Sequence, residues 1–119
     1  MVTQSTSPLY SPEAFLCIKK TMQTAGFSVL PYQNSVPSMG QWGWQLGIRK
    51  KAMSADLLKQ KLTMKKFSKI ETQFFNQDAM ISMAHFGKGL FEKEGEIEPN
   101  TQFDHNILKY YKHGSWDLY

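Results

Sequence analysis

The chain has 119 residues, of which 41% are hydrophobic and 13% aromatic, and it carries a net charge of +4. This composition excludes a disordered chain, and the length allows one domain at most. The sequence contains no apolar run of roughly 18 residues, as a membrane span requires, and no signal-peptide pattern at its N-terminus. A single cysteine, Cys17, excludes a disulfide framework. We therefore expect a cytoplasmic setting.

The positive charge is concentrated in one segment. Eight basic residues and one acid, Asp56, lie between Arg49 and Lys69, whereas the segment from Glu92 to Glu98 is acidic. A basic face can bind nucleic acid or an anionic lipid surface, and it can also be an ordinary solvated surface. We favour the solvated surface and expect no nucleic-acid partner, because the aromatic and basic residues are not interleaved as in single-strand binders.

The first elements in chain order are a short strand and a helix. Met1 to Ser5 is prone to β structure, and as a first strand it leaves an edge that needs a partner. Ser11-Pro12-Glu13 is a typical helix start, with an N-cap serine, a proline at the first helical position and an acid in the first turn. Apolar residues at helical spacing predict a helix that ends at Ala25, followed by Gly26 in a left-handed conformation.

Two strands follow this helix. Phe27 to Tyr32 predicts one strand, and Trp42 to Arg49 predicts a second, in which large apolar residues alternate with small or polar ones. About nine residues join them without a helix, so we expect antiparallel neighbours. The first fifty residues thus have the order strand, helix, strand, antiparallel strand.

Short helices dominate the rest of the chain. The predicted elements are a helix capped by Ser54 to about Leu62, an extended segment 70–75, a helix capped by Asn76 to about Phe86, an acidic loop 92–100, and a last helix that starts in a capping box at Thr101 and ends at Gly114. The chain is therefore interpreted as one partial domain, 1–119, with a sheet edge in 1–49 and a mainly helical extension in 50–119.

Few residues have the spacing of a catalytic or metal site. The histidines show no metal-binding spacing, Cys17 is expected to fill space in a helix flank, and no glycine-rich phosphate loop is present. The segment from Tyr32 to Ile48 retains a functional interpretation, because it places two tryptophans beside a turn built from proline and glycine. Both tryptophans can be ordinary hydrophobic filling on one face of the strand. We favour filling for Trp44, and for Trp42, next to the turn, we favour a pocket wall at the end of the sheet.

Two motifs resemble a known family. Gln4-Ser5-Thr6-Ser7-Pro8, then Ala25-Gly26-Phe27, Tyr32, and Val36-Pro37-Ser38-Met39-Gly40-Gln41-Trp42-Gly43-Trp44 are similar, in this order, to the C-terminal part of the polyamine aminopropyltransferases, the spermidine synthase family. Its bacterial members include proteins with a membrane region before the enzyme domain. Met39 stands where other members often place an aromatic residue. The likeness extends from Val2 to about Trp116 and is weak between Lys50 and Lys69.

The resemblance implies a fold and a reaction. The fold would be α/β, the C-terminal portion of a Rossmann-like, methyltransferase-type sheet that is parallel except for one antiparallel strand near its end. The reaction would be transfer of the aminopropyl group of decarboxylated S-adenosylmethionine, the co-substrate, to putrescine or a similar amine. The resemblance implies that the amine pocket is bordered by Gln4, Ser38, Met39, Gly40, Gln41 and Trp42.

The resemblance also implies what this sequence does not supply. The family's nucleoside-binding loop and its proton-abstracting aspartate have no counterpart here, so we expect no catalytic residue, no bound cofactor and no activity of this chain alone. A separate nucleoside-binding half, or a second copy pairing through the first strand, would complete it. The alternative is a non-catalytic binding or interaction module derived from the same fold.

Overall fold

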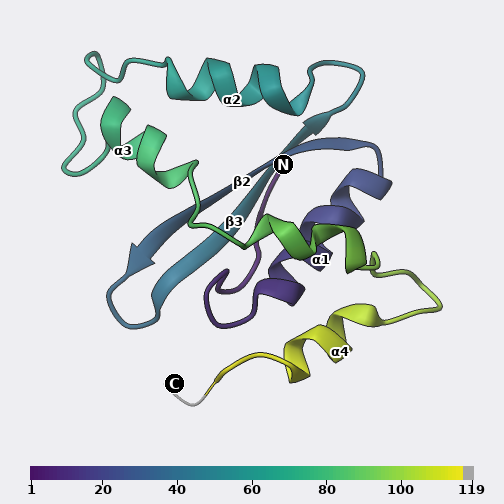
Figure 1. Cartoon of the computed structure of the whole chain (residues 1–119). Helices are drawn as coiled ribbons and strands as arrows, with labels where there is room; N and C mark the ends of the chain where they lie inside the picture. Colours follow the sequence, from purple (N-terminus) through teal and green to yellow (C-terminus); the bar gives the residue numbers. More distant parts are fainter. Residues whose placement is uncertain (117–119) are drawn as a thin grey trace.

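The computed structural model describes residues 1–116 and shows a three-stranded sheet with helices around it (Figure 1). The elements in chain order are β1 (Val2–Gln4), α1 (Pro12–Thr24), β2 (Phe27–Val36), β3 (Gly40–Arg49), α2 (Ala55–Thr63), α3 (Gln77–Met83), the 3₁₀ helix η1 (Phe91–Glu96) and α4 (Asn106–Lys112). The predicted order of strand, helix, strand and antiparallel strand is confirmed.

The strand order in space is β1-β3-β2. β3 is antiparallel to both neighbours, with Gln4 opposite Trp44 on one side and Tyr32 opposite Trp44 on the other. β1 and β2 are therefore parallel to each other, and their C-terminal ends lie at the same edge of the sheet as the start of β3. In residues 1–116, β1 pairs on one side only, so the free strand edge predicted for Met1 to Ser5 is confirmed.

The hairpin is tighter than the sequence suggested. β2 and β3 pair from Phe27 opposite Arg49 to Val36 opposite Gly40, so three residues rather than about nine connect them. The turn is closed by a hydrogen bond from the Met39 N–H to the Val36 carbonyl, and Gly40 has a φ of 72°, in the left-handed region. Polar residues such as Gln33 and Asn34 are accommodated in β2 because the backbone of this strand pairs with β3.

Helix α1 packs closely on one face of β3 through two glycines. A Cβ atom at Gly43 would lie 2.6 Å from Cδ2 of Phe15, and one at Gly47 would lie 2.7 Å from the methyl carbon of Met22. The Gln45 side chain, fully buried between these glycines, donates a hydrogen bond to the Phe15 carbonyl. The small and polar face of β3 is therefore the one against α1, and the tryptophans point to the opposite face.

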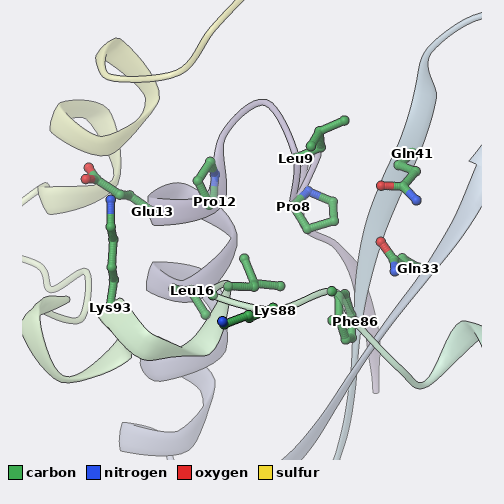
Figure 2. A pocket seen from close by; sticks show the side chains of 13 residues that line it. Pro8, Leu9, Pro12, Glu13, Leu16, Gln33, Gln41, Phe86, Lys88 and Lys93 are labelled. Atoms are coloured by element: carbon green, nitrogen blue, oxygen red, sulfur yellow. The ribbon is translucent and has the colours of Figure 1, made fainter.

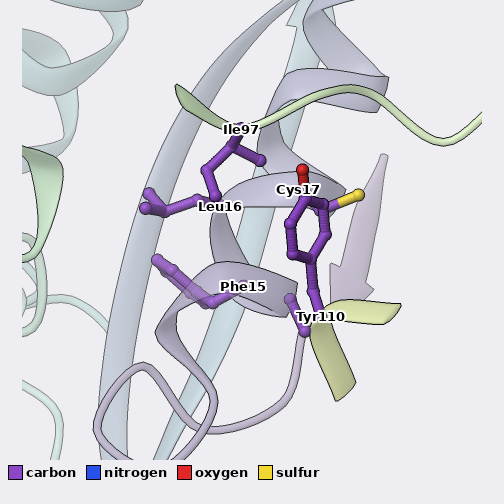
Figure 3. Packing of buried hydrophobic residues seen from close by; sticks show 6 residues of the cluster. Phe15, Leu16, Cys17, Ile97 and Tyr110 are labelled. Atoms are coloured by element: carbon purple, nitrogen blue, oxygen red, sulfur yellow. The ribbon is translucent and has the colours of Figure 1, made fainter. Parts of the chain in front are cut away.

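The main core is built around α1. Leu16 and Cys17 are buried with Ile97 and Tyr110, which come from the segments after η1 and within α4, and Phe15 joins this cluster from the side of α1 that contacts Gly43 (Figure 3). The Tyr110 hydroxyl accepts a hydrogen bond from the Glu98 N–H, and Cys17 lies 3.4 Å from the Glu98 carbonyl oxygen. Leu16 is also buried, because α1 is covered on two sides.

The predicted caps are partly confirmed. Ser54 accepts a hydrogen bond from the Leu57 N–H, Asn76 accepts one from the Ala79 N–H, and Gly26 is left-handed with a φ of 93°. Ser11 precedes α1 as predicted, but its hydroxyl makes no capping bond. Thr101 accepts from the Asp104 N–H in a turn that precedes α4 rather than beginning it.

Three predicted segments differ in the structure. Residues 70–75 form turns and bends instead of a strand, α3 ends at Met83 before Phe86, and the acidic loop contains η1. The last helix, predicted to start at Thr101, is α4 and begins at Asn106, so Phe103 lies before it and is 87% exposed. Within the described residues, no helix has both the length and the apolar character needed to cross a bilayer.

The contact between α1 and Gly43 should dominate the stability of this fold. We predict that Gly43→Ala lowers the free energy of unfolding by about 1 to 3 kcal/mol, because the added methyl overlaps Phe15 and the Thr6 carbonyl. Gly87→Ala is the matched control, since a Cβ atom added there would have no atom within 4 Å, and should change stability by at most about 0.5 kcal/mol. Urea unfolding of both variants tests this, and equal midpoints would contradict the packing argument.

Candidate functional site

Five side chains share the face of the sheet that points away from α1. We call this the aromatic face and define it by Gln4, Tyr32, Asn34, Trp42 and Trp44. The register places Gln4, Trp44 and Tyr32 in one row across the three strands, with Asn34 opposite Trp42 in the next row on this face. The face lies at the edge where the parallel strands β1 and β2 end, which is where open α/β sheets bind ligands.

The aromatic rings of this face have a fixed arrangement. Tyr32 and Trp44 stack with their ring centroids 6.4 Å apart and their planes inclined by 15°. The Trp44 indole N–H donates a 2.7 Å hydrogen bond to the Asn34 side-chain oxygen, which holds the indole across the hairpin. Both rings and Trp42 are half-buried, so one side of each ring system lies toward solvent. The result is a preorganised wall of π-electron density with an amide oxygen beside it.

The loop that follows β1 is strained and rich in buried hydroxyls. Thr6 has a φ of 60°, in a region that non-glycine residues adopt only at a cost. Its carbonyl accepts a 2.7 Å hydrogen bond from the Gly43 N–H, and the Ser5 N–H donates to the Gly43 carbonyl. Among residues 1–116, the buried side-chain oxygens of Ser5 and Thr6 and the indole nitrogen of Trp42 have no hydrogen-bonding partner. Strain and unpaired polar atoms at strand ends are typical of functional sites.

The predicted site residues do not all lie on this face. Gln4 and Trp42 belong to the aromatic face, and Ser38, Met39 and Gly40 form the turn of the hairpin or its first strand residue. Gln41 points to the α1 side, because it alternates with Trp42 along β3. The structure therefore divides the predicted set between two faces and the turn.

Gln41 lines a separate cavity of about 380 Å³ on the α1 side. Figure 2 shows the Gln33 and Gln41 amides next to each other, with Pro8 and Leu9 opposite them and Leu16 and Phe86 farther along the wall. Its charged lining residues are Glu13 and Lys93 at the other end and Lys88 near Leu16. This cavity and the aromatic side chains lie on opposite faces of the hairpin.

Tyr32, Asn34 and Trp44 are members of the face that sequence reasoning did not assign to a site. The hairpin register would have predicted these residues, since every second residue of β2 shares a face with Trp42 and Trp44. The sequence favoured hydrophobic filling for Trp44, but the buried residues of β3 are Gly43, Gln45 and Gly47.

The described part of the chain is thus an α/β sheet unit with aromatic side chains gathered on one face of its hairpin. Comparison with curated proteins shows to which family the chain is related. The chain is 26% identical to polyamine aminopropyltransferase 2 of Ralstonia nicotianae over 112 residues, 94% of this chain and 20% of the relative. It is 29% identical to polyamine aminopropyltransferase 2 of Aquifex aeolicus over 111 residues, 92% of this chain and 20% of the relative.

A shorter segment is more similar. Over 46 residues, 39% of this chain and 8% of the relative, the identity to the polyamine aminopropyltransferase of Shewanella oneidensis is 46%. The chain is a relative of the polyamine aminopropyltransferases, the spermidine synthase family. It spans about a fifth of the length of the relatives that it matches almost throughout. No family model and no solved structure matches it.

The hydrogen bond between Trp44 and Asn34 should contribute measurably to stability. We predict that Asn34→Ala lowers the free energy of unfolding by roughly 1 kcal/mol, because the indole N–H loses its acceptor. Ser35→Ala, at the exposed neighbouring position, is the control and should have a smaller effect. Urea unfolding followed by tryptophan fluorescence measures both, and equal losses would mean that the hydrogen bond does not hold the indole.

The position of Tyr32 also predicts a pH dependence. Burial raises the pKa of the Tyr32 phenol above its ordinary value of 10.0. Because the folded-state pKa is the higher one, its contribution to stability is complete below about pH 10 and is lost as pH rises through the folded-state pKa. Tyr32→Phe should therefore show a smaller alkaline loss of stability than the unaltered chain, in urea unfolding between pH 8 and 11. An identical alkaline loss would contradict this.

Proposed function

We propose that the chain forms one wall of the amine site of a spermidine synthase-like aminopropyltransferase. In this proposal the aromatic face receives the alkyl amine, putrescine or a similar amine, that attacks the aminopropyl group of decarboxylated S-adenosylmethionine. The row Gln4, Trp44 and Tyr32 across the three strands is the observation that carries the proposal. The relationship to polyamine aminopropyltransferases supports the same reaction class.

The chemistry of the face suits an alkyl ammonium ion. The half-buried rings of Tyr32, Trp42 and Trp44 can cover methylene groups and attract an ammonium group by cation-π interaction, each contact contributing roughly 0.5 to 2 kcal/mol. The side-chain oxygens of Gln4 and Asn34 accept hydrogen bonds from an ammonium group. Asn34 keeps this capacity because its oxygen has a second lone pair beside the one that Trp44 uses.

The topology suits the fold that the resemblance implies. A methyltransferase-type sheet is parallel except for one antiparallel strand near its end. Here β3 is antiparallel and lies between the parallel strands β1 and β2. We therefore assign the three strands to the last part of such a sheet, with further parallel strands continuing it beyond the free edge of β1.

The chain alone is proposed to be inactive. The residues that define the aromatic face include no carboxylate, and a polyamine carries charges that need carboxylates to offset their desolvation. Proton abstraction and nucleoside binding are accordingly assigned to a nucleoside-binding half, joined through β1, or to a second copy of the chain. Exposed Val2 and Gln4 on β1 belong to the surface that this partner would cover.

A transferase assay tests this function. The chain is mixed with the part of the Ralstonia nicotianae relative that precedes the matching region, and aminopropyl transfer from decarboxylated S-adenosylmethionine to putrescine is measured. We expect transfer by the mixture and none by the chain alone. Trp42→Ala and Tyr32→Ala should each raise the KM for putrescine about 2- to 30-fold, the range that one cation-π contact supports.

Two results would contradict the assignment. Turnover by the chain alone would show that it is complete, and an unchanged KM and kcat in both variants would remove the aromatic face from the amine site. Phe103→Ala is the matched aromatic control, because this ring is 87% exposed and lies outside the face. Its kinetics should match those of the unaltered chain.

The alternative function is a binding module derived from the same fold. The lack of carboxylates on the aromatic face favours it, since such a surface can bind an alkyl amine weakly without reacting with it. Quenching or shifting of tryptophan fluorescence by putrescine, lost in Trp44→Ala, together with no transfer by any reconstituted pair, would identify the module. Transfer by the pair would exclude it.

A further inference from the structure

The connection between α2 and α3 displays apolar side chains to solvent. Met64 is 72% exposed, Ile70 61% and Phe74 76%. We call this segment, residues 64–76, the α2–α3 loop. In Figure 1 it reaches out at the side of the molecule, away from α1 and α4. Three large exposed apolar residues within one loop make this loop a candidate interaction surface.

The α2–α3 loop is closed at its base by contacts between its two ends. The rings of Phe67 and Phe75 meet edge to face with centroids 4.6 Å apart. The Gln77 side-chain amide donates to the Thr63 carbonyl, which joins the end of α2 to the start of α3. Two hydrogen bonds close turns inside the loop. The Ile70 N–H donates to the Phe67 carbonyl, and the Thr72 hydroxyl donates to the Phe75 carbonyl.

Lysines surround the exposed apolar residues. Five lysines and one acid, Glu71, lie between Lys59 and Glu71, and the lysines at 61, 65, 66 and 69 are exposed. Leu57 and Lys61 lie one turn apart on α2, and Met64 follows Lys61 by three residues, so an apolar and basic stripe leads along the helix into the loop. The next acid along the chain, Asp78, lies inside α3.

We infer that the α2–α3 loop docks on an anionic phospholipid surface. Apolar side chains enter the interface between headgroups and acyl chains, while the flanking lysines remain at the level of the phosphates. Charge complementarity selects anionic lipid, and the aliphatic Met64 and Ile70 favour a bilayer over nucleic acid because, unlike the ring of Phe74, they offer no stacking plane to a base. This docking is independent of the aminopropyl transfer reaction.

Vesicle flotation with the 119-residue chain tests the inference. We expect binding to vesicles of phosphatidylcholine mixed with phosphatidylglycerol, little binding to phosphatidylcholine alone, and weaker binding at high salt. Lys65→Glu combined with Lys66→Glu should reduce the affinity at least about tenfold, since each lysine near an anionic surface contributes about 1 kcal/mol. Ile70→Ser combined with Phe74→Ser should also release the chain from the vesicles.

Matched variants on the other side of the molecule serve as controls. Lys109→Glu combined with Lys112→Glu changes the net charge equally, and Phe103→Ser removes an exposed ring, yet both should leave vesicle binding unchanged. Circular dichroism checks that every variant is folded. Equal binding to neutral and anionic vesicles, equal loss in the control variants, or binding to duplex DNA without binding to vesicles would overturn the inference.

Discussion

The close approach of α1 to β3 determines the rest of this structure. Phe15 and Met22 lie seven residues apart, about 10.5 Å along a helix, and Gly43 and Gly47 lie four residues apart, about 13 Å along a strand. The helix and the strand therefore run side by side, with each large side chain placed on a glycine. A side chain at either glycine would push α1 off the sheet and disturb the core that α1 forms with Ile97 and Tyr110.

This packing decides which face of the hairpin is available to a ligand. Because side chains alternate along β3, placing the glycines under α1 directs Trp42 and Trp44 to the other face. Ser28 and Leu30, at the far end of that face, are buried, and α2 and α3 contact β2. The rings near the turn remain half-buried. The aromatic face is thus a consequence of the core on the opposite side, and the two cannot be altered independently.

Local chemistry in the sequence predicted much of the fold. Ser54, Asn76 and Gly26 act at helix ends through their own side chains or backbone, so their roles could be predicted without tertiary information. The buried face of β3 could not be predicted in this way, because glycines are buried only when a partner such as Phe15 approaches closely. The same limit applied to Trp44, whose size suggested filling, and to Gln41, whose side depends on the hairpin register.

Other errors have equally specific causes. Gln33, Asn34 and Ser35 are poor strand formers by propensity, yet they extend β2 because β3 offers each a backbone partner. Thr101 and Asp104 have the spacing of a helix start, but their hydrogen bond closes a separate turn, and α4 begins after it. Pairing with β3 determined the structure of the first segment, and a competing local turn determined that of the second. Neither can be predicted from residue spacing alone.

The order of the strands makes the two proposed contacts compatible. The free edge of β1 and the edge strand β2 lie on opposite sides of β3, and α2 and α3 contact β2. A partner that extends the sheet from β1 would therefore add its strands on the side away from the α2–α3 loop. The loop would still be exposed to a lipid surface, since its base is fixed by Phe67, Phe75 and Gln77 and not by any contact with β1. A completed amine site and a docked loop can accordingly exist in the same molecule.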